Sequence, residues 1–289
     1  MDNNEILLIH LGGLGDVCLS ESLFLSFRKH FGDCLVGLGN RRLLDLFKEY
    51  FVRVEGVESR RWLYLFSEKL NGPRWRQIIF IGKDRKSILR NRWRAHSQEK
   101  IIFIDMYPEN AFAVRATVCG SSEPEYNPKV HIESYQLAQL TQYGIGPLQK
   151  IPLWEKSLRV ILYPETGFEK EKWHHENFVN LYHSLTTRGL DGIVLESPGL
   201  SINVDKRIFF DDLKEVKQFF SQGGIFVSND SGMAHLAGAS GLFTITIFTG
   251  FNPSFWHPRG RNISLVQKQD MFDLPFLERI ITQTMNDSL

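Results

Sequence analysis

The chain of 289 residues has few cysteines, almost no net charge and no long apolar run. Its three cysteines, Cys18, Cys34 and Cys119, include no CxxC or CxxH pair. This spacing argues against a disulfide framework and against a zinc site, and it favours a reducing compartment. The net charge of +1 gives no reason to expect a nucleic-acid partner.

Membrane-directing segments are also missing. The first five residues, Met-Asp-Asn-Asn-Glu, lack the basic start and the long apolar core of a signal peptide. No run approaches the ~20 apolar residues that span a bilayer. We therefore expect a cytoplasmic protein, with peripheral contact at the inner face of the cytoplasmic membrane as a second option.

Short apolar runs alternate with helical patterns along the chain, which predicts an α/β protein with parallel sheets buried on both faces. The strand-like runs are 6–11, 34–38, 77–81, 101–104, 158–163, 192–196, 224–228 and 244–248. The helical patterns are 16–30, 43–50, 131–143, 177–188, 211–221, 232–239 and 271–285. A linker that starts in 144–152 divides the chain into two domains, 1–150 and 151–289. Ligands of such sheets bind at the carboxyl ends of the strands.

The first strand leads into a glycine-rich turn that contains Gly12 and Gly13. Glycines allow close approach of a ligand, and the N-terminus of the following helix favours anions. The dinucleotide fingerprint GxGxxG is absent, because Cys18 stands at its third glycine. Asp16 is either a helix N-cap or a catalytic carboxylate, and the two interpretations are compatible.

Two further loops between a strand and a helix carry polar residues. In the first, Thr166, Gly167, Lys170 and Lys172 could hold a diphosphate, although three glutamates in the same stretch also fit a solvated charge run. In the second, Asp230 could accept hydrogen bonds from sugar hydroxyls, and the N–H groups of Ser231 and Gly232 could hold phosphate. A plain helix cap followed by a buried His235 is the alternative for this second loop.

The stretch 83–94 holds six cations and one acid, and Arg41 and Arg42 form a basic pair in the same half. A solvated helix face explains each residue singly. Together they could form a surface for an anionic acceptor, such as a phosphorylated glycolipid, or for anionic headgroups. Stacking aromatics are not interleaved as a nucleic-acid groove would require.

Taken together, these segments resemble glycosyltransferase family 9, the ADP-heptose:lipopolysaccharide heptosyltransferases and their relatives. Leu14-Gly15-Asp16-Val17 matches the end of the family's first loop, and Trp173 with Glu176-Asn177-Phe178 resembles its nucleotide-side loop and helix. The most specific match is 227–241, followed by Trp256-His257-Pro258-Arg259-Gly260. The resemblance covers nearly the whole chain and is weak over 51–122.

This resemblance implies a GT-B fold, two facing Rossmann-like domains with the acceptor on the N-terminal domain and the nucleotide sugar on the C-terminal one. It implies inverting, metal-independent transfer of a sugar, heptose from ADP-heptose, to a lipopolysaccharide-core or related glycan, without a cofactor. Asp16 would be the general base. The donor-binding residues would be Thr166, Gly167, Lys170, Lys172, Asp230, Ser231, Gly232, Met233 and His235. The acceptor-side residues would be His10, Gly12, Gly13, Arg41 and Arg42.

The sequence departs from the family pattern at several positions. Glu171 stands where the family has a phosphate-binding lysine, and His10 replaces a basic residue of the first strand. A degenerate GT-B protein that binds a nucleotide sugar or a glycan without turnover is therefore the alternative. A nucleotide-sugar epimerase is a third interpretation, but it needs carboxylates and a histidine that the sequence does not place.

Overall fold

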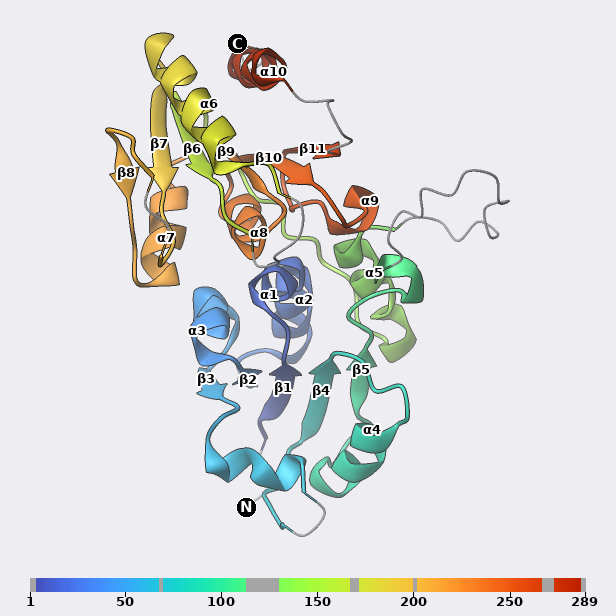
Figure 1. The fold of residues 1–289 in the computed structure, drawn as a ribbon. Helices are drawn as coiled ribbons and strands as arrows, with labels where there is room; N and C mark the ends of the chain where they lie inside the picture. Colours follow the sequence, from blue (N-terminus) through green and yellow to red (C-terminus); the bar gives the residue numbers. More distant parts are fainter. Residues whose placement is uncertain are drawn as a thin grey trace. The chain divides into compact units, whose positions relative to one another are not determined.

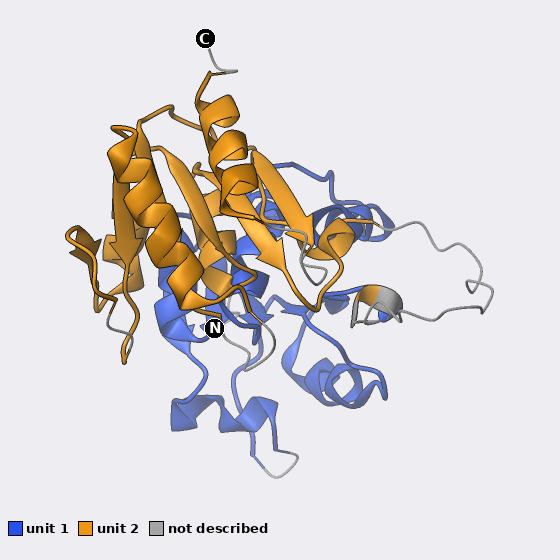
Figure 2. Cartoon of the chain, turned by 45° about the horizontal axis from the view of Figure 1, so that its top comes forward, with its two compact units in different colours: residues 1–109, 132–150 blue, residues 110–131, 151–289 orange. Residues whose placement is uncertain are grey.

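The computed structural model describes residues 4–67, 70–112, 130–166, 172–199, 202–266 and 273–286. The chain divides into two compact units (Figure 2). Unit 1 consists of residues 1–109 and 132–150, and unit 2 of residues 110–131 and 151–289. Each unit is built on its own parallel sheet (Figure 1), so the predicted α/β fold with two parallel sheets is confirmed.

Unit 1 has a five-stranded sheet in the order β3-β2-β1-β4-β5. Its strands are β1 (Ile6–His10), β2 (Leu35–Gly39), β3 (Arg53–Gly56), β4 (Gln77–Ile81) and β5 (Ile102–Ile104). Its α-helices are α1 (Leu14–Leu19), α2 (Glu21–Phe31), α3 (Arg41–Leu44), α4 (Ile88–Trp93) and α5 (Ile132–Ala138). The 3-10 helices η1 (Asp45–Tyr50), η2 (Arg60–Leu65), η3 (Arg94–His96) and η5 (Thr141–Tyr143) fill the connections, and η4 (Glu109–Phe112) includes the point along the chain at which unit 1 ends and a segment of unit 2 begins.

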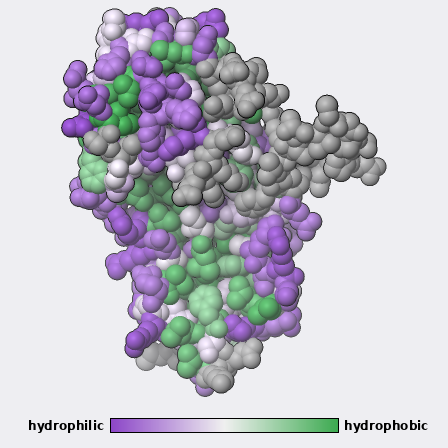
Figure 3. Space-filling model, in the orientation of Figure 1, coloured by the Kyte–Doolittle hydropathy of each residue, from purple (hydrophilic) through white to green (hydrophobic). Residues whose placement is uncertain are grey.

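One face of this sheet is covered by aromatic side chains rather than by a long helix. Trp62, Trp75 and Trp93 pack with alternate residues of the strands, among them Leu7 and Phe80. In the view of Figure 3, hydrophobic side chains gather over unit 1 between hydrophilic flanks. Trp62 lies in η2, Trp93 ends the short helix α4, and Trp75 lies just before β4. All three fall within 51–122, where the resemblance to the family is weak.

Unit 2 has a six-stranded sheet in the order β11-β10-β9-β6-β7-β8. Its strands are β6 (Arg159–Tyr163), β7 (Asp191–Leu195), β8 (Arg207–Ile208), β9 (Ile225–Asn229), β10 (Phe243–Phe248) and β11 (Asn262–Val266). Its helices are α6 (His175–Thr187), α7 (Leu213–Phe220), α8 (Gly232–Ala239), α9 (Pro253–Trp256) and α10 (Leu274–Asn286). Apolar residues of α6 and α10 share one hydrophobic core with the strands.

In both sheets, the order in which successive strands are added reverses next to the first strand. In unit 1 the chain runs from β1 outward to β3 and then returns to place β4 on the other side of β1. In unit 2 it runs from β6 outward to β8 and then returns to place β9 beside β6. Ligands of open α/β sheets bind outside the carboxyl ends of strands at such reversals. The loops after β1, β6 and β9 therefore hold the positions where a ligand is expected.

The elements differ from the sequence patterns at a few places. The helix expected over 16–30 is two helices, α1 and α2, with a break at Ser20, whose hydroxyl bonds to other buried side chains. The edge strands β3, β8 and β11 were not predicted, because Arg53–Gly56 is partly charged and half-exposed and Arg207–Ile208 has only two residues. Within the described residues, no helix has the length and apolar character needed to cross a membrane.

Candidate functional site

The loop after β1 is built on a buried histidine. His10 is 1% exposed, its Nδ1 accepts the N–H of Gly12 at 3.2 Å, and its Nε2 lies 3.2 Å from the Ser20 hydroxyl. These contacts place the proton on Nε2, and burial lowers the pKa of His10 to about 4. His10 is thus a neutral support of the glycine loop. Its predicted role on the acceptor side could only be exerted through that loop.

Asp16 lies on the first turn of α1. The N-cap is Gly13, so the expectation that Asp16 itself is the N-cap is wrong by three residues. Its Oδ2 instead reaches back and accepts the N–H of Gly13 at 2.8 Å. Burial raises the pKa of Asp16, while hydrogen bonds from the Tyr107 hydroxyl and the Gly13 N–H lower it. A half-buried carboxylate whose pKa is raised is suited to take a proton near neutral pH.

The predicted acceptor-side residues occupy neighbouring strand ends of unit 1. Gly12 packs so closely that a Cβ there would lie 2.6 Å from Cβ of Asp16, whereas one at Gly13 would meet Asp16 at an ordinary 3.7 Å. Arg41 and Arg42 begin α3 directly after β2 and are exposed. Their exposure leaves both guanidinium groups within reach of an anionic ligand, and their acceptor role stays a prediction.

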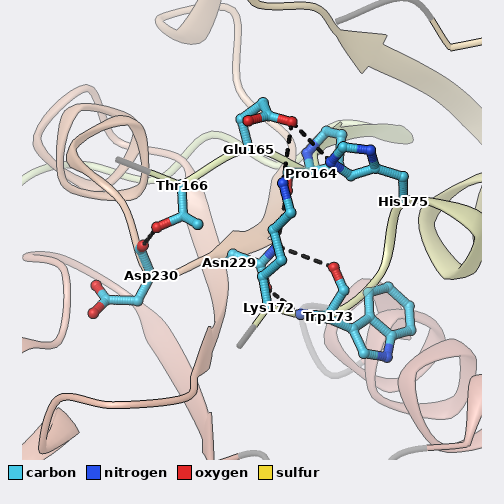
Figure 4. A network of polar contacts seen from close by, with 8 residues as sticks. All are labelled: Pro164, Glu165, Thr166, Lys172, Trp173, His175, Asn229 and Asp230. Atoms are coloured by element: carbon cyan, nitrogen blue, oxygen red, sulfur yellow. Dashed lines mark hydrogen bonds and ion pairs between the residues drawn. The ribbon is translucent and has the colours of Figure 1, made fainter. Parts of the chain in front are cut away.

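In unit 2, Asn229 joins the loops after β6 and β9 (Figure 4). Its side chain is 2% exposed; Oδ1 accepts the N–H of Trp173 at 2.9 Å, and Nδ2 donates to the carbonyl of Pro164 at 2.8 Å. One amide therefore holds both ends of the loop between these two residues. Asn229 belongs to the sequence motif 227–241, but the sequence analysis predicted no role for it.

The loop after β6 contains the residues predicted to hold a diphosphate. The Thr166 hydroxyl donates to the carbonyl of Asp230 at 2.8 Å, which ties this loop to the next one. Lys172 Nζ lies 3.5 Å from Glu165 Oε1, and His175 Nε2 lies 2.7 Å from the same oxygen. Lys172, one of the two lysines predicted to hold the diphosphate, is thus already paired with a carboxylate. Gly167, Lys170 and Glu171 lie outside the described residues.

The loop after β9 leads into α8, whose N-cap is Ser231. Its Oγ accepts the N–H of Ala234 at 3.3 Å. Ser231, Gly232 and Met233 are half-exposed, whereas residues 234–238 of the helix are buried. The first N–H groups of a helix have no partner within the helix and favour an anion. The three predicted donor residues at this helix start are therefore placed where a phosphate can reach them.

Asp230 lies between this helix start and the loop after β6. Its backbone N–H donates to the carbonyl of Ile247 at 2.9 Å. Burial raises the pKa of its carboxyl to about 7. Near neutral pH the group is thus balanced between its ionised and its protonated form. Such a group is a candidate for a ligand contact, because the energy of burying its charge is recovered only when a partner binds it.

His235 is buried beside two other histidines of unit 2. It is 5% exposed, and burial, with smaller contributions from His131 and His257, lowers its pKa to about 3. The rings of His131 and His257 stack with centroids 3.9 Å apart, and His131 Nε2 lies 2.9 Å from the carbonyl of His257. His235 therefore fits the interpretation of a buried, neutral histidine, and its role as a donor contact stays a prediction. No group of side chains in the described part of the chain is arranged to hold a metal ion.

The basic stretch lines a cavity of about 580 Å³ beside β5. Arg90, Arg94 and Lys100 contribute cations to its wall. The stretch is also structural, since the Asp84 carboxylate accepts the N–H of Arg90 at 2.8 Å. The guanidinium of Arg90 packs 4.4 Å from the ring centroid of Phe103. An anionic acceptor or a headgroup at this surface stays a prediction.

The chain is similar to known proteins both in sequence and in structure. Residues 211–277 match the model of glycosyltransferase family 9 (heptosyltransferase). No curated protein matches the chain. The chain is similar to the structure of E. coli heptosyltransferase WaaC with ADP, with a TM-score of 0.70 and 14% identity over 96% of this chain and 99% of that one.

Two further solved structures give the same picture. A glycosyl transferase family 9 protein from Veillonella parvula has a TM-score of 0.62 and 14% identity over 98% of this chain and 92% of that one. E. coli ADP-heptose lps heptosyltransferase II has a TM-score of 0.59 and 14% identity over 97% and 99%. At this identity the likeness establishes the fold, two parallel-sheet α/β units as in these transferases.

Proposed function

We propose that this chain is a heptosyltransferase-like protein of glycosyltransferase family 9 and that it transfers a sugar from a nucleotide donor to a glycan hydroxyl. The transfer inverts the anomeric centre and uses no metal. We assign the acceptor side to unit 1 and the donor side to unit 2. The observation that carries the proposal is Asp16, a half-buried carboxylate held by the N–H of Gly13 at the carboxyl end of β1.

In the proposed step, an acceptor hydroxyl gives its proton to the Asp16 carboxylate while its oxygen attacks the anomeric carbon. The bond between that carbon and the diphosphate oxygen breaks, and the electron pair leaves on the diphosphate. Burial raises the pKa of Asp16 toward the working pH, which strengthens the carboxylate as a base. Attack from the face opposite the leaving group inverts the anomeric configuration.

The donor is held by the loops after β6 and β9. The N-terminus of α8, with Ser231, Gly232 and Met233 half-exposed, is the proposed site of the diphosphate. Asp230, in its ionised form, accepts hydrogen bonds from donor hydroxyls. Lys172 would turn from Glu165 toward the leaving diphosphate and stabilise the charge that develops there.

The proposed donor is ADP-heptose, and the proposed acceptor is a lipopolysaccharide core or a related anionic glycan. Support comes from two similar structures, those of E. coli heptosyltransferase WaaC with ADP and with ADP-2-deoxy-2-fluoro heptose. On unit 1, the exposed Arg41 and Arg42 suit a negatively charged acceptor.

A second candidate function is binding of a nucleotide sugar without turnover. The contact of Lys172 with Glu165 favours it, because a lysine neutralised by a carboxylate supports a leaving diphosphate less well. Both candidates require the donor to bind, and only the first requires acceptor-dependent release of the nucleotide.

The experiment that tests the proposal measures binding and turnover separately. Thermal shifts with ADP, UDP and GDP sugars identify the donor, because a ligand of the folded state raises its stability. The native chain is then incubated with that donor, a deacylated core oligosaccharide and EDTA, and the anomeric configuration of the product is read by NMR. An inverted product is expected. A thermal shift without product for any nucleotide sugar would instead establish the binding protein, and a retained configuration would contradict the mechanism.

A further inference from the structure

Tyr107, in the loop after β5, bonds to the residue on which the proposed chemistry depends. Its hydroxyl donates a hydrogen bond to the carboxylate of Asp16. The same carboxylate accepts the N–H of Gly13 at 2.8 Å. Asp16 is thus held from two sides, by its own helix start and by a loop that lies two strands away in the sheet order.

The segment that carries Tyr107 is fixed by two glutamines. Gln139 Oε1 accepts the N–H of Asp105 at 2.8 Å, and its Nε2 donates to the carbonyl of the same residue at 2.9 Å. Gln136 Nε2, on α5, donates to the carbonyl of Met106 at 3.1 Å. Three backbone groups of the two residues before Tyr107 are therefore bound to side chains, and these bonds fix the position of the Tyr107 backbone.

Gln136 also joins the loop that carries Tyr107 to the glycine-rich loop after β1. Gln136 Oε1 accepts the Ser20 hydroxyl proton at 3.1 Å, and the Ser20 oxygen lies 3.2 Å from His10 Nε2. His10 Nδ1 in turn accepts the N–H of Gly12 at 3.2 Å. Gln136, Ser20 and His10 are almost completely buried. A continuous chain of hydrogen bonds therefore runs from the loop of Tyr107 to the loop of Asp16.

We propose that Tyr107 is a positioning residue for Asp16, supported by Gln136 and Gln139. This inference rests on the proposed function, in which Asp16 takes the acceptor proton. A base must present its free lone pair within hydrogen-bond reach of the hydroxyl it deprotonates. Two hydrogen bonds that approach the carboxylate from different elements restrict its rotation and leave the remaining lone pairs for the acceptor. Displacement of a catalytic group by ~1 Å can reduce the rate about a hundredfold.

The tyrosine also changes the acidity of the base. Burial raises the pKa of Asp16, and the hydrogen bond from Tyr107 lowers it. Loss of the hydroxyl should therefore raise that pKa further, so that less of the carboxylate is ionised at a given pH. Burial and the charge of Asp16 raise the pKa of Tyr107 itself, which keeps the phenol protonated and able to donate.

The test compares Tyr107→Phe with Tyr143→Phe. Both changes remove a hydrogen-bonded hydroxyl from unit 1, but the Tyr143 hydroxyl binds the backbone of Phe103 and not Asp16. For Tyr107→Phe, the acid limb of kcat/KM should move upward by about one pH unit, and kcat at pH 7 should fall about tenfold with the KM for the donor unchanged. For Tyr143→Phe, the acid limb should stay in place.

A second readout does not depend on turnover. The carboxyl carbons of aspartate are labelled with ¹³C, Asp16 is assigned by its loss in Asp16→Asn, and its pKa is measured by NMR titration of the free protein. An upward shift in Tyr107→Phe supports the inference, and an unchanged pKa overturns it even if the chain is an active transferase. If Tyr107→Phe fails to fold, Gln139→Met removes the two bonds to Asp105 and should move the pKa in the same direction. Absence of turnover in the native chain would refute only the proposed function, because the NMR titration still tests whether Tyr107 bonds to Asp16 and lowers its pKa.

Discussion

The backbone N–H of Trp173, in the loop after β6, donates a 2.9 Å hydrogen bond to Oδ1 of Asn229 at the end of β9. β6 and β9 are the neighbouring strands between which the strand order of unit 2 reverses. The amide of Asn229 binds Pro164 at the other end of the same loop. The loop proposed to hold the donor diphosphate is thus closed by one buried side chain at the last position of β9.

Asn229→Ala should weaken donor binding because it releases both ends of this loop. It leaves buried backbone groups of Pro164 and Trp173 unsatisfied, which costs about 1–3 kcal/mol for each group. We expect the donor affinity to fall at least tenfold, as measured by calorimetry, together with a lower Tm.

Arg188→Ala is the matched control for this loop. It removes the bond of Arg188 to the nearly buried Glu278, at 2.6 Å, beyond the C-terminal end of α6. This variant should lose stability while it keeps the affinity for the donor. Equal affinities in both variants would show that Asn229 supports the fold and not the donor loop.

Asp230→Asn should have opposite effects on binding and on stability. Burial raises the pKa of the folded carboxyl from 3.8 to about 7, so the folded state holds a proton that the unfolded chain has lost between these values. The contribution of this group to the free energy of unfolding therefore falls as the pH rises from about 4 to 7, and it stays low above pH 7. At ~1.4 kcal/mol for each pKa unit, removing the charge should stabilise the free protein at pH 8 by up to a few kcal/mol.

The same substitution should weaken donor binding about tenfold or more, because an ionised acceptor of hydrogen bonds is lost. In the native chain, donor affinity should rise as the pH rises through 7 and Asp230 ionises. Urea unfolding at pH 4.5 and 8, with calorimetry at each pH, checks both effects. Stabilisation of Asp230→Asn that is the same at both pH values would contradict the raised pKa.

Gly12 and Gly13 are adjacent but should respond differently to alanine. A Cβ at Gly12 would lie 2.6 Å from Cβ of Asp16 and 2.9 Å from Cε1 of His10, so the base must move. A Cβ at Gly13 meets Asp16 Oδ2 at 3.7 Å, an ordinary contact. We expect Gly12→Ala to lower kcat/KM about a hundredfold and Gly13→Ala to have a much smaller effect. Equal losses in the two variants would show that steric displacement of Asp16 is not the cause.

The sequence predicts the α/β alternation and the polar loops at the strand ends, because both depend on local patterns. Asp230 and the residues that begin α8 directly follow a buried strand, and Asp16 lies in the first turn of the helix after β1, so their position at the carboxyl edge could be inferred from the chain alone. The start of α8 at Gly232 was predicted to the residue for the same reason.

Tyr107 and Asn229 could not be recognised in this way. Tyr107 reaches Asp16 only because the chain places β4 and β5 beside β1, which no local pattern encodes. Asn229 is the last residue of a buried strand, and a polar amide at such a position, in Ile225–Asn229, is the signal that could have indicated a loop anchor. The pairing of Lys172 with Glu165 was likewise hidden, since the spacing shows both charges but not their contact.

The most direct test of the account measures the release of ADP from ADP-heptose, with and without a deacylated core acceptor, for the native chain and for Asp16→Asn. The account predicts acceptor-dependent release by the native chain and a rate at least about a hundredfold lower for the variant, with an unchanged thermal shift by ADP. Equal rates in the two proteins would contradict the assignment of Asp16 as the base.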